Sequence, residues 1–223
     1  MVFQNSDLAV SVLITLKVVG LTTILLILIG IPVGYFLATR SGIVEKAVLV
    51  LCIFPLVMPP TVTGFFLFGL FSKTGLLGNL LFSLFDLRIA FTWIAAVIAS
   101  TVISLPIMII SARQAFRTIP QELVDTTKVY HGNWSDYYLK ALFPLAKNGL
   151  LGGLILSVTR AFGEFGATMM IAGNISGQTQ TLSLHIYESF ISGNDSELLI
   201  SAGILVLISL GAVGITFSIL REK

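Results

Sequence analysis

The stretch LLISAGILVLISLGAVGITFSIL, residues Leu198–Leu220, decides the class of fold, because it carries no charged side chain along its length. An α-helix rises 1.5 Å per residue and needs roughly 20 residues to cross the hydrocarbon core of a bilayer. A helix of this length in a soluble protein would carry charged residues on one face. The sequence therefore predicts that this stretch is a transmembrane helix.

Further charge-poor segments predict that the chain is an all-α membrane protein of about five transmembrane helices. Composition agrees, because 56% of the 223 residues are hydrophobic and only 11% are charged, against roughly 25% in a soluble domain. Residues 1–223 are expected to form one transmembrane domain with its core at about 11–220. The other expected spans are Val10–Thr39, Ala47–Phe71, Ile89–Ala112 and a fourth that starts near Asn148.

Basic residues are distributed unevenly among the connecting segments, and this distribution predicts the orientation, because cytoplasmic loops retain Lys and Arg. One set of connections contains only Lys73 and Arg88. The other set contains Arg40, Lys46, Arg113, Arg117, Lys128, Lys140, Lys147, Arg221 and Lys223. The N-terminus is therefore expected outside, the C-terminus in the cytoplasm, and residues 113–147 in a cytoplasmic loop. The net charge of +2, without a basic patch, excludes nucleic acid as a partner.

Arg160 and Glu164 interrupt the fourth expected span, where a charge costs several kcal/mol. Their i, i+4 spacing places them on one helix face, where the two side chains can pair. They form either a structural ion pair that orders the bundle or the border of a polar path that attracts an anion. The two roles are compatible.

Prolines and a polar segment mark irregular places in the expected spans. Pro59 and Pro60 fall within the second span, and such residues act either as packing kinks or in gating. The segment Gly173–Tyr187 is rich in Asn, Ser, Gln and Thr, so it is expected on the outer side or lining a cavity rather than against lipid.

The loop at 113–147 contains the pattern of a short helix. Pro120 suits a first helical turn, Glu122 and Asp125 favour the positive end of the helix dipole, and Gly132 begins a plausible terminator. Beyond it, an exposed apolar surface is expected that either anchors at the membrane interface or docks a soluble partner. Its residues are Trp134, Tyr137, Tyr138, Leu139, Leu142 and Phe143.

No catalytic or metal-binding constellation is visible, since the single Cys52 lacks companions and no phosphate-binding loop occurs. The chain is therefore not expected to be an enzyme or to bind a cofactor of its own. A transporter of this kind must take its energy from elsewhere. A secondary transporter, with Glu164 or His185 as a proton relay, is the alternative from another class.

The loop resembles the motif E-A-A-x3-G-x9-I-x-L-P found in permeases of binding-protein-dependent ABC importers. The acid, the spacing and the proline are retained when the two are aligned on Pro144. In that family the short helix fits a groove on the ATPase subunit and is called the coupling helix. The residues that the resemblance implies for coupling are Asp125, Thr126, Thr127, Tyr130, His131, Gly132 and Pro144.

Two further stretches resemble the molybdate and sulfate group of these permeases. They are FPLVMPPTVTGF at 54–65, followed by KTGLLG at 73–78, and RAFGEFGAT at 160–168, continued by AGNISGQTQTL at 172–182. A translocation path is proposed along both stretches. The residues are Pro59, Pro60, Thr61, Thr63, Arg160, Glu164 and Thr168 for the path, and Asn174, Thr179 and Thr181 for an outer polar segment.

The resemblance implies the type I importer permease fold, with the coupling helix between the third and fourth spans. It also implies a homodimer in a prokaryotic cell membrane, two ATP-binding cassette subunits that hold ATP and Mg on the cytoplasmic side, and an oxyanion-binding protein outside. The expected substrate is molybdate. Tungstate and sulfate are alternatives, because tetrahedral dianions differ little in charge and only modestly in size.

Overall fold

The structure, a computed structural model that describes residues 4–130 and 137–221, is all-helical throughout the described residues. Four of the described helices are long and apolar enough to cross a membrane, or five if one bent pair counts as a single span. The elements are α1 (Gln4–Leu25), the π-helix η1 (Leu26–Gly30), α2 (Ile31–Thr39), α3 (Ile43–Val57), α4 (Pro60–Phe71), α5 (Leu76–Phe85), α6 (Trp93–Arg117), α7 (Gln121–Tyr130), the π-helix η2 (Tyr137–Leu142), α9 (Phe143–Phe162), α10 (Gly166–Ala172), α11 (Leu182–Ile191) and α12 (Asp195–Arg221).

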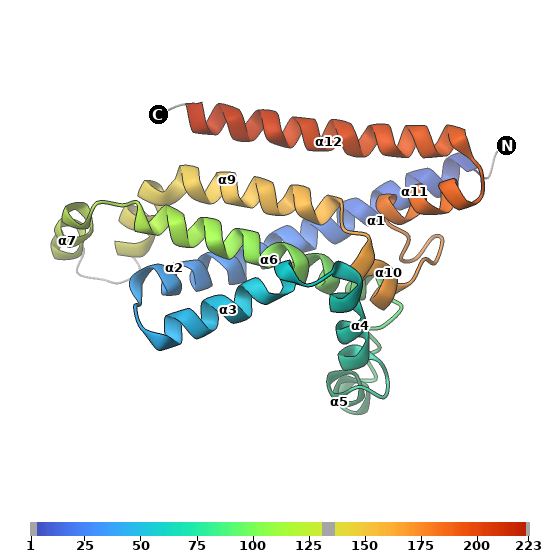
Figure 1. Cartoon of the computed structure of the whole chain (residues 1–223), viewed down its shortest axis with the longest axis horizontal. Coiled ribbons are helices and arrows are strands. Elements are labelled where there is room, and N and C mark those ends of the chain that lie inside the picture. Colours follow the sequence, from blue (N-terminus) through green and yellow to red (C-terminus); the bar gives the residue numbers. More distant parts are fainter. Residues whose placement is uncertain (1–3, 131–136, 222–223) are drawn as a thin grey trace.

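Three expected spans are confirmed as long apolar helices. The first runs continuously over Asp7–Thr39 through α1, η1 and α2, the third is α6, and the fifth is α12. Figure 1 shows the long helices lying side by side with their axes roughly aligned, as crossing helices of a bundle do. Hydrophobic length alone was sufficient to find these three, because no charge interrupts their central turns.

The second expected span is not one straight helix. After α3 the chain turns sharply, so that α4 makes an angle of 111° with it. Met58 and Pro59 take extended conformations at the break, since proline disfavours the helical conformation in the residue before it. Figure 1 shows α4 and α5 projecting from the bundle as an arm. The span expected over Ala47–Phe71 therefore consists of two helices joined at a sharp break.

The fourth span begins earlier than expected. It extends over Tyr137–Phe162 rather than from near Asn148, so the connection expected at 113–147 already contains the start of this helix. Lys140 and Lys147 lie exposed in its first turns, where their long stems can reach past apolar surface to water. Helix α7 confirms the short helix predicted in the connection. His131, Gly132 and Trp134 lie outside the described residues.

Helix α6 is the centre of the bundle and α12 is its edge. In the most apolar stretch of α6, 61% of the residues are buried, against 6% in that of α12. Small residues allow close approach to α6, because a Cβ on Gly34 of α2 would meet the Ala112 methyl at 2.5 Å. Figure 1 shows α12 along one side of the molecule, where it contacts α9 and α11.

Charged and aromatic side chains join the helices at the end of the bundle that carries α7. Glu45 of α3 is buried, and its Oε1 lies 2.6 Å from Arg113 Nη2 and 3.4 Å from Arg117 Nη2 of α6. Nearby, the Tyr138 ring lies edge-on to that of Tyr35 at 5.0 Å. The expectation that the apolar residues here form an exposed surface is therefore partly wrong. Tyr137 and Leu142 are buried, while Leu139 and Phe143 are exposed.

Candidate functional site

The two stretches that resemble oxyanion permeases meet in the structure, because α4 packs directly on α10. A Cβ added to Gly64 would lie 2.7 Å from Ala167 Cα, so only glycine allows the two helix backbones this close. One turn away, a Cβ on Gly166 would lie 3.2 Å from both Pro60 Cβ and Thr61 Cγ2. The close packing thus joins residues about 100 positions apart in the sequence into one surface.

Arg160 and Glu164 form the expected ion pair across the break between α9 and α10. Arg160 Nη1 lies 2.8 Å from Glu164 Oε2, and the Glu164 side chain is 1% exposed against 30% for Arg160. Within the described residues Oε2 has no aligned hydrogen-bond donor, so this contact is a charge pairing. Glu164 Oε1 accepts a 2.8 Å hydrogen bond from the backbone N–H of Ala167. The carboxylate therefore caps the start of α10 while it neutralises Arg160.

The residues expected along a path divide into buried and accessible groups. Thr63, Glu164 and Thr168 are buried, and the hydroxyls of the two threonines have no hydrogen-bond partner among the described residues. Pro59 and Thr61 are exposed, and Pro60 and Arg160 are partly exposed. Of these residues, only those in the second group are accessible from the surface.

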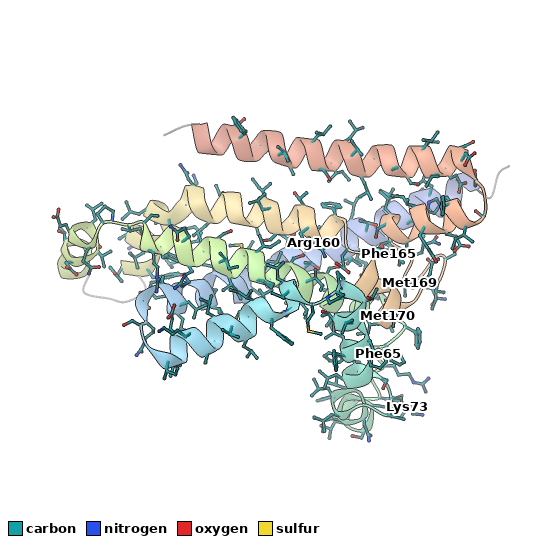
Figure 2. All side chains as sticks on the ribbon, in the orientation of Figure 1. Phe65, Lys73, Arg160, Phe165, Met169 and Met170 are labelled. Atoms are coloured by element: carbon teal, nitrogen blue, oxygen red, sulfur yellow. The ribbon has the colours of Figure 1, made fainter. Side chains whose placement is uncertain are left out.

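Figure 2 shows how the surface around these residues extends from the bundle to the arm. Arg160 lies at the end of α9, Met169 and Met170 follow on α10, Phe65 is on α4, and Lys73 is at the far end of the arm. Phe65 is 59% exposed and Met170 39%. An apolar surface with a cation at either end therefore remains uncovered in the single chain.

The outer polar segment folds back onto α1 instead of extending away from the protein. Thr179 and Thr181 are buried, and Thr179 Oγ1 accepts a 3.1 Å hydrogen bond from the backbone N–H of Ile175. Asn174 Nδ2 donates to Glu188 Oε2 at 2.9 Å. The three predicted residues thus lie near one another, as parts of a loop that is held by its own side chains.

Ser11 and Thr15 of α1 were missed by sequence reasoning, although they help to fix this loop. Ser11 Oγ donates to Gln180 Oε1 at 3.2 Å, and Thr15 Oγ1 accepts from the backbone N–H of Leu182 at 2.7 Å. The signal for them was their i, i+4 spacing in an otherwise apolar stretch, which places two hydroxyls on one helix face.

A second missed cluster joins α11 to the start of α12. His185 is buried, its Nδ1 lies 3.1 Å from Ser201 Oγ, and its Nε2 lies 3.5 Å from Glu197 Oε2. The Glu197 atom Oε1 is buried and has no hydrogen-bond partner among the described residues. Glu164 and His185 were each considered as a proton relay. In the structure the two have different partners, because His185 pairs with Glu197 and Glu164 pairs with Arg160.

The predicted coupling residues lie on α7 and at the start of α9. Asp125 is exposed and accepts a 3.1 Å hydrogen bond from Gln121 Nε2. The hydroxyls of Thr126 and Thr127 donate to carbonyl groups of their own helix, at 2.7 Å to Glu122 O and 2.8 Å to Leu123 O. Tyr130 is the last residue of α7, and Pro144 occupies the first turn of α9. Val124 of α7 packs onto the aromatic cluster formed by Tyr35, Phe116 and Tyr138.

Among the residues that the structure describes, no group of three or more His, Cys, Asp or Glu side chains could hold a metal ion. Figure 2 shows Arg160 next to the junction of the two motif stretches. Among the path residues the accessible polar groups are the Arg160 guanidinium and the Thr61 hydroxyl, a combination that suits weak contact with an anion.

Comparison with known proteins gives a consistent picture. A family profile described as "Binding-protein-dependent transport system inner membrane component" matches residues 30–221. A provisionally named molybdenum transport system permease protein, YvgM, of Bacillus subtilis is 38% identical, covering 86% of this chain and 84% of that protein. The molybdenum transport system permease protein ModB of Azotobacter vinelandii is 32% identical, covering 100% of this chain and 98% of that protein.

Solved structures show the same fold. An inward-facing MetNI methionine ABC transporter aligns with a TM-score of 0.68 at 17% identity, covering 95% of both chains. A bacterial ABC transporter that imports the acidic polysaccharide alginate aligns with a TM-score of 0.66 at 16% identity, covering 97% of this chain and 81% of that one. The expected fold of an ABC importer permease is thereby confirmed.

Proposed function

We propose that this chain, which belongs to the family of inner membrane components of binding-protein-dependent transport systems, is the membrane-spanning subunit of an ATP-driven molybdate importer. The observation that carries the proposal is the close packing of the two motif stretches at Gly64 and Ala167, in a chain with 32–38% identity to molybdenum transport permeases. Tungstate and sulfate are the rival substrates within the same class, because each is a tetrahedral dianion.

Two copies of the chain are proposed to enclose the path. The uncovered surface of α4 and α10 supports this arrangement, because Phe65 and Phe66 are 59% and 63% exposed in the single chain. In a membrane protein such a surface is covered either by lipid or by a second copy of the chain, and the proposal assigns it to the second copy. In the dimer, Pro59, Thr61 and Arg160 would border the path, and the hydroxyl and guanidinium donors would hold the ion weakly enough for release.

Energy is proposed to enter through α7. The N-terminus would lie outside and the C-terminus inside, so that α7 meets one of two ATP-binding cassette subunits, which hold ATP and Mg. Asp125 and Thr126 are exposed on α7, whereas Val124 attaches the helix to the bundle. A movement of α7 would then reach α6 through Val124 and the aromatic cluster. The chain itself would hydrolyse nothing.

The decisive experiment measures uptake of labelled molybdate into vesicles that contain this chain with its ATPase and binding protein. We expect molybdate uptake that requires ATP and is not inhibited by excess sulfate. Tungstate should inhibit it to an extent set by the affinity of the transporter for tungstate relative to molybdate. Replacing Asp125 with Arg should abolish ATP-driven uptake and leave membrane insertion unchanged, while Asp7→Arg, at an exposed position in the first turn of α1, serves as the matched control.

The outcomes separate the candidate functions. Inhibition by excess sulfate would assign the chain to sulfate transport. Uptake that ignores ATP depletion and stops with an uncoupler would instead indicate the secondary transporter. Uptake by Asp125→Arg at the wild-type rate would refute the role of α7.

A further inference from the structure

The arm formed by α4 and α5 contains a cavity of about 540 Å³ between the two helices and the segment that leads into α6. Its lining combines aromatic walls with polar groups, namely Ser72, Lys73, Thr74, Phe82, Arg88 and Thr92. A single water occupies ~30 Å³ in the liquid. The cavity therefore has room for an ion with four oxygens and for part of its hydration shell.

Two cations share one aromatic ring in this cavity. Lys73 Nζ lies 4.5 Å from the centroid of the Phe82 ring, and Arg88 Cζ lies 5.2 Å from the same centroid. The two charges are therefore closer to each other than ~10 Å, the screening length at 0.1 M salt, and they repel. Neither cation has an ion pair among the described residues. A bound dianion would relieve this repulsion.

The ring and the hydroxyls prepare the site for an anion. Lys73 and Arg88 are both exposed, and their contacts with the Phe82 ring hold the two charges near one another before an anion arrives. Ser72 Oγ and Thr74 Oγ1 lie 3.4 Å apart and share one hydrogen bond, which leaves one hydroxyl hydrogen free to donate. The side chains thus provide charge and hydrogen-bond donors together.

The turn that carries Lys73 is fixed rather than adaptable. A Cβ on Gly78 would overlap the carbonyl groups of Phe71 and Ser72, so only glycine allows α5 to approach the end of α4 this closely. The backbone N–H of Gly75 also donates to Ser72 O at 2.9 Å. Lys73 is therefore presented from a tight, hydrogen-bonded turn.

A strained residue connects this cavity to α10. Phe91 lines the cavity and has φ +60°, a conformation that bulky side chains rarely adopt. It is held there because its backbone N–H donates to Ile171 O of α10 at 3.0 Å. Strain that persists in this way is concentrated at functional sites. The cavity is thus attached to the helix that carries the second motif stretch.

We propose that this cavity is a binding site for a tetrahedral oxyanion, held by the Lys73 ammonium and the Arg88 guanidinium. The inference rests on the proposed function, in which such an ion is the substrate and the arm faces the outside. The site would then receive the ion before it reaches Arg160. The phosphate group of a lipid offers the same chemistry, so the test includes both sources.

The experiment measures equilibrium binding of labelled molybdate to the full chain, purified in a phosphate-free maltoside detergent at low ionic strength. We expect Lys73→Gln and Arg88→Gln each to weaken binding at least tenfold, and Lys73→Arg to restore it. Arg40→Gln is the matched control, because Arg40 Cζ also lies over a ring, that of Phe36 at 5.8 Å, and far from the arm in sequence. A second arm of the experiment measures binding of phosphatidylglycerol to the same variants.

Each outcome decides the proposal. Loss of molybdate binding in both arm variants supports a site for the free ion, and loss of only phosphatidylglycerol binding supports the same chemistry with lipid as its source. Unchanged binding of both ligands, or an equal loss in Arg40→Gln, overturns the site. Vesicle uptake separates this result from the proposed function. If the unsubstituted chain takes up molybdate and the arm variants bind it as well as that chain does, only the cavity site is refuted. If the unsubstituted chain takes up no molybdate, the proposed substrate is refuted.

Discussion

The contact between α4 and α10 is sensitive to a single methyl group, and this sensitivity can be measured. In Gly64→Ala, the new Cβ would lie 2.7 Å from Ala167 Cα and 2.7 Å from its carbonyl oxygen, both of which are backbone atoms that cannot rotate away. Overpacking of this kind typically costs about 1–3 kcal/mol. The two helices must separate slightly, or α4 must tilt about the break at Pro59.

Gly69→Ala provides the matched control on the same helix, because a Cβ there meets nothing within 4 Å. Both substitutions gain the helix preference of alanine, about 0.5–1 kcal/mol, so this contribution cancels between the variants. The remaining difference of about 1–3 kcal/mol corresponds to a melting temperature about 2–12 °C lower for Gly64→Ala.

The assay is thermal unfolding of the purified full chain in detergent, followed by uptake measurements in vesicles. We expect Gly64→Ala to unfold at the lower temperature and to transport more slowly, while Gly69→Ala does neither. Equal melting temperatures for the two variants would refute the argument that the helices meet at Gly64.

Three further predictions concern the polar contacts. Arg160→Gln should lower the free energy of unfolding by about 3–5 kcal/mol, because it leaves the buried Glu164 carboxylate without its cation. Glu164→Gln should lower it less, because the Arg160 side chain is 30% exposed and water can solvate it. Thermal unfolding of the two variants ranks these losses. Thr15→Val should cost about 1–3 kcal/mol in the same assay, because the backbone N–H of Leu182 loses its acceptor. Ser201→Ala should accelerate hydrogen exchange in the first turns of α12, because His185 Nδ1 loses its partner at 3.1 Å.

Controls for these variants lie on the same helices. Thr23→Val removes a hydroxyl that donates only within its own helix, to Val19 O at 2.8 Å, so it should be nearly neutral beside Thr15→Val. Ser209→Ala should leave exchange at the start of α12 unchanged. A larger loss from Glu164→Gln than from Arg160→Gln would contradict the burial argument for the ion pair.

Hydropathy predicted the long helices well but not the path of the chain between them. The absence of charge in Leu198–Leu220 was sufficient for α12, because any apolar stretch of that length crosses a bilayer. Pro59 and Pro60 indicated a break in the second span, yet proline removes a hydrogen bond without setting the direction of the next helix. The chain turns by 111° there, and Gly64 of α4 lies against Ala167, a contact invisible in the local sequence.

The candidate site was predicted in part. The spacing of Arg160 and Glu164 predicted their pairing correctly, although the two do not share a helix, because α9 ends at Phe162. The contact of Thr15 with Leu182 could not be predicted, since 167 positions separate the two residues and either could have met another helix. The early start of the fourth span was missed because Lys140 and Lys147 were interpreted as loop residues. The path and coupling roles stay predictions.

The exposure of α12 has a consequence for how this protein changes over evolutionary time. Leu199, Leu207 and Leu210 are more than 60% exposed, so within the single chain they are selected for apolarity rather than for shape. Many sequences satisfy that requirement equally well, whereas Ser201, which is fully buried beside His185, has few substitutes. We therefore expect the sequence of the outward face of α12 to diverge freely between related permeases, while the sequence of its first turns stays nearly constant. An unrelated apolar helix grafted beyond Ser209 should then still yield a working transporter.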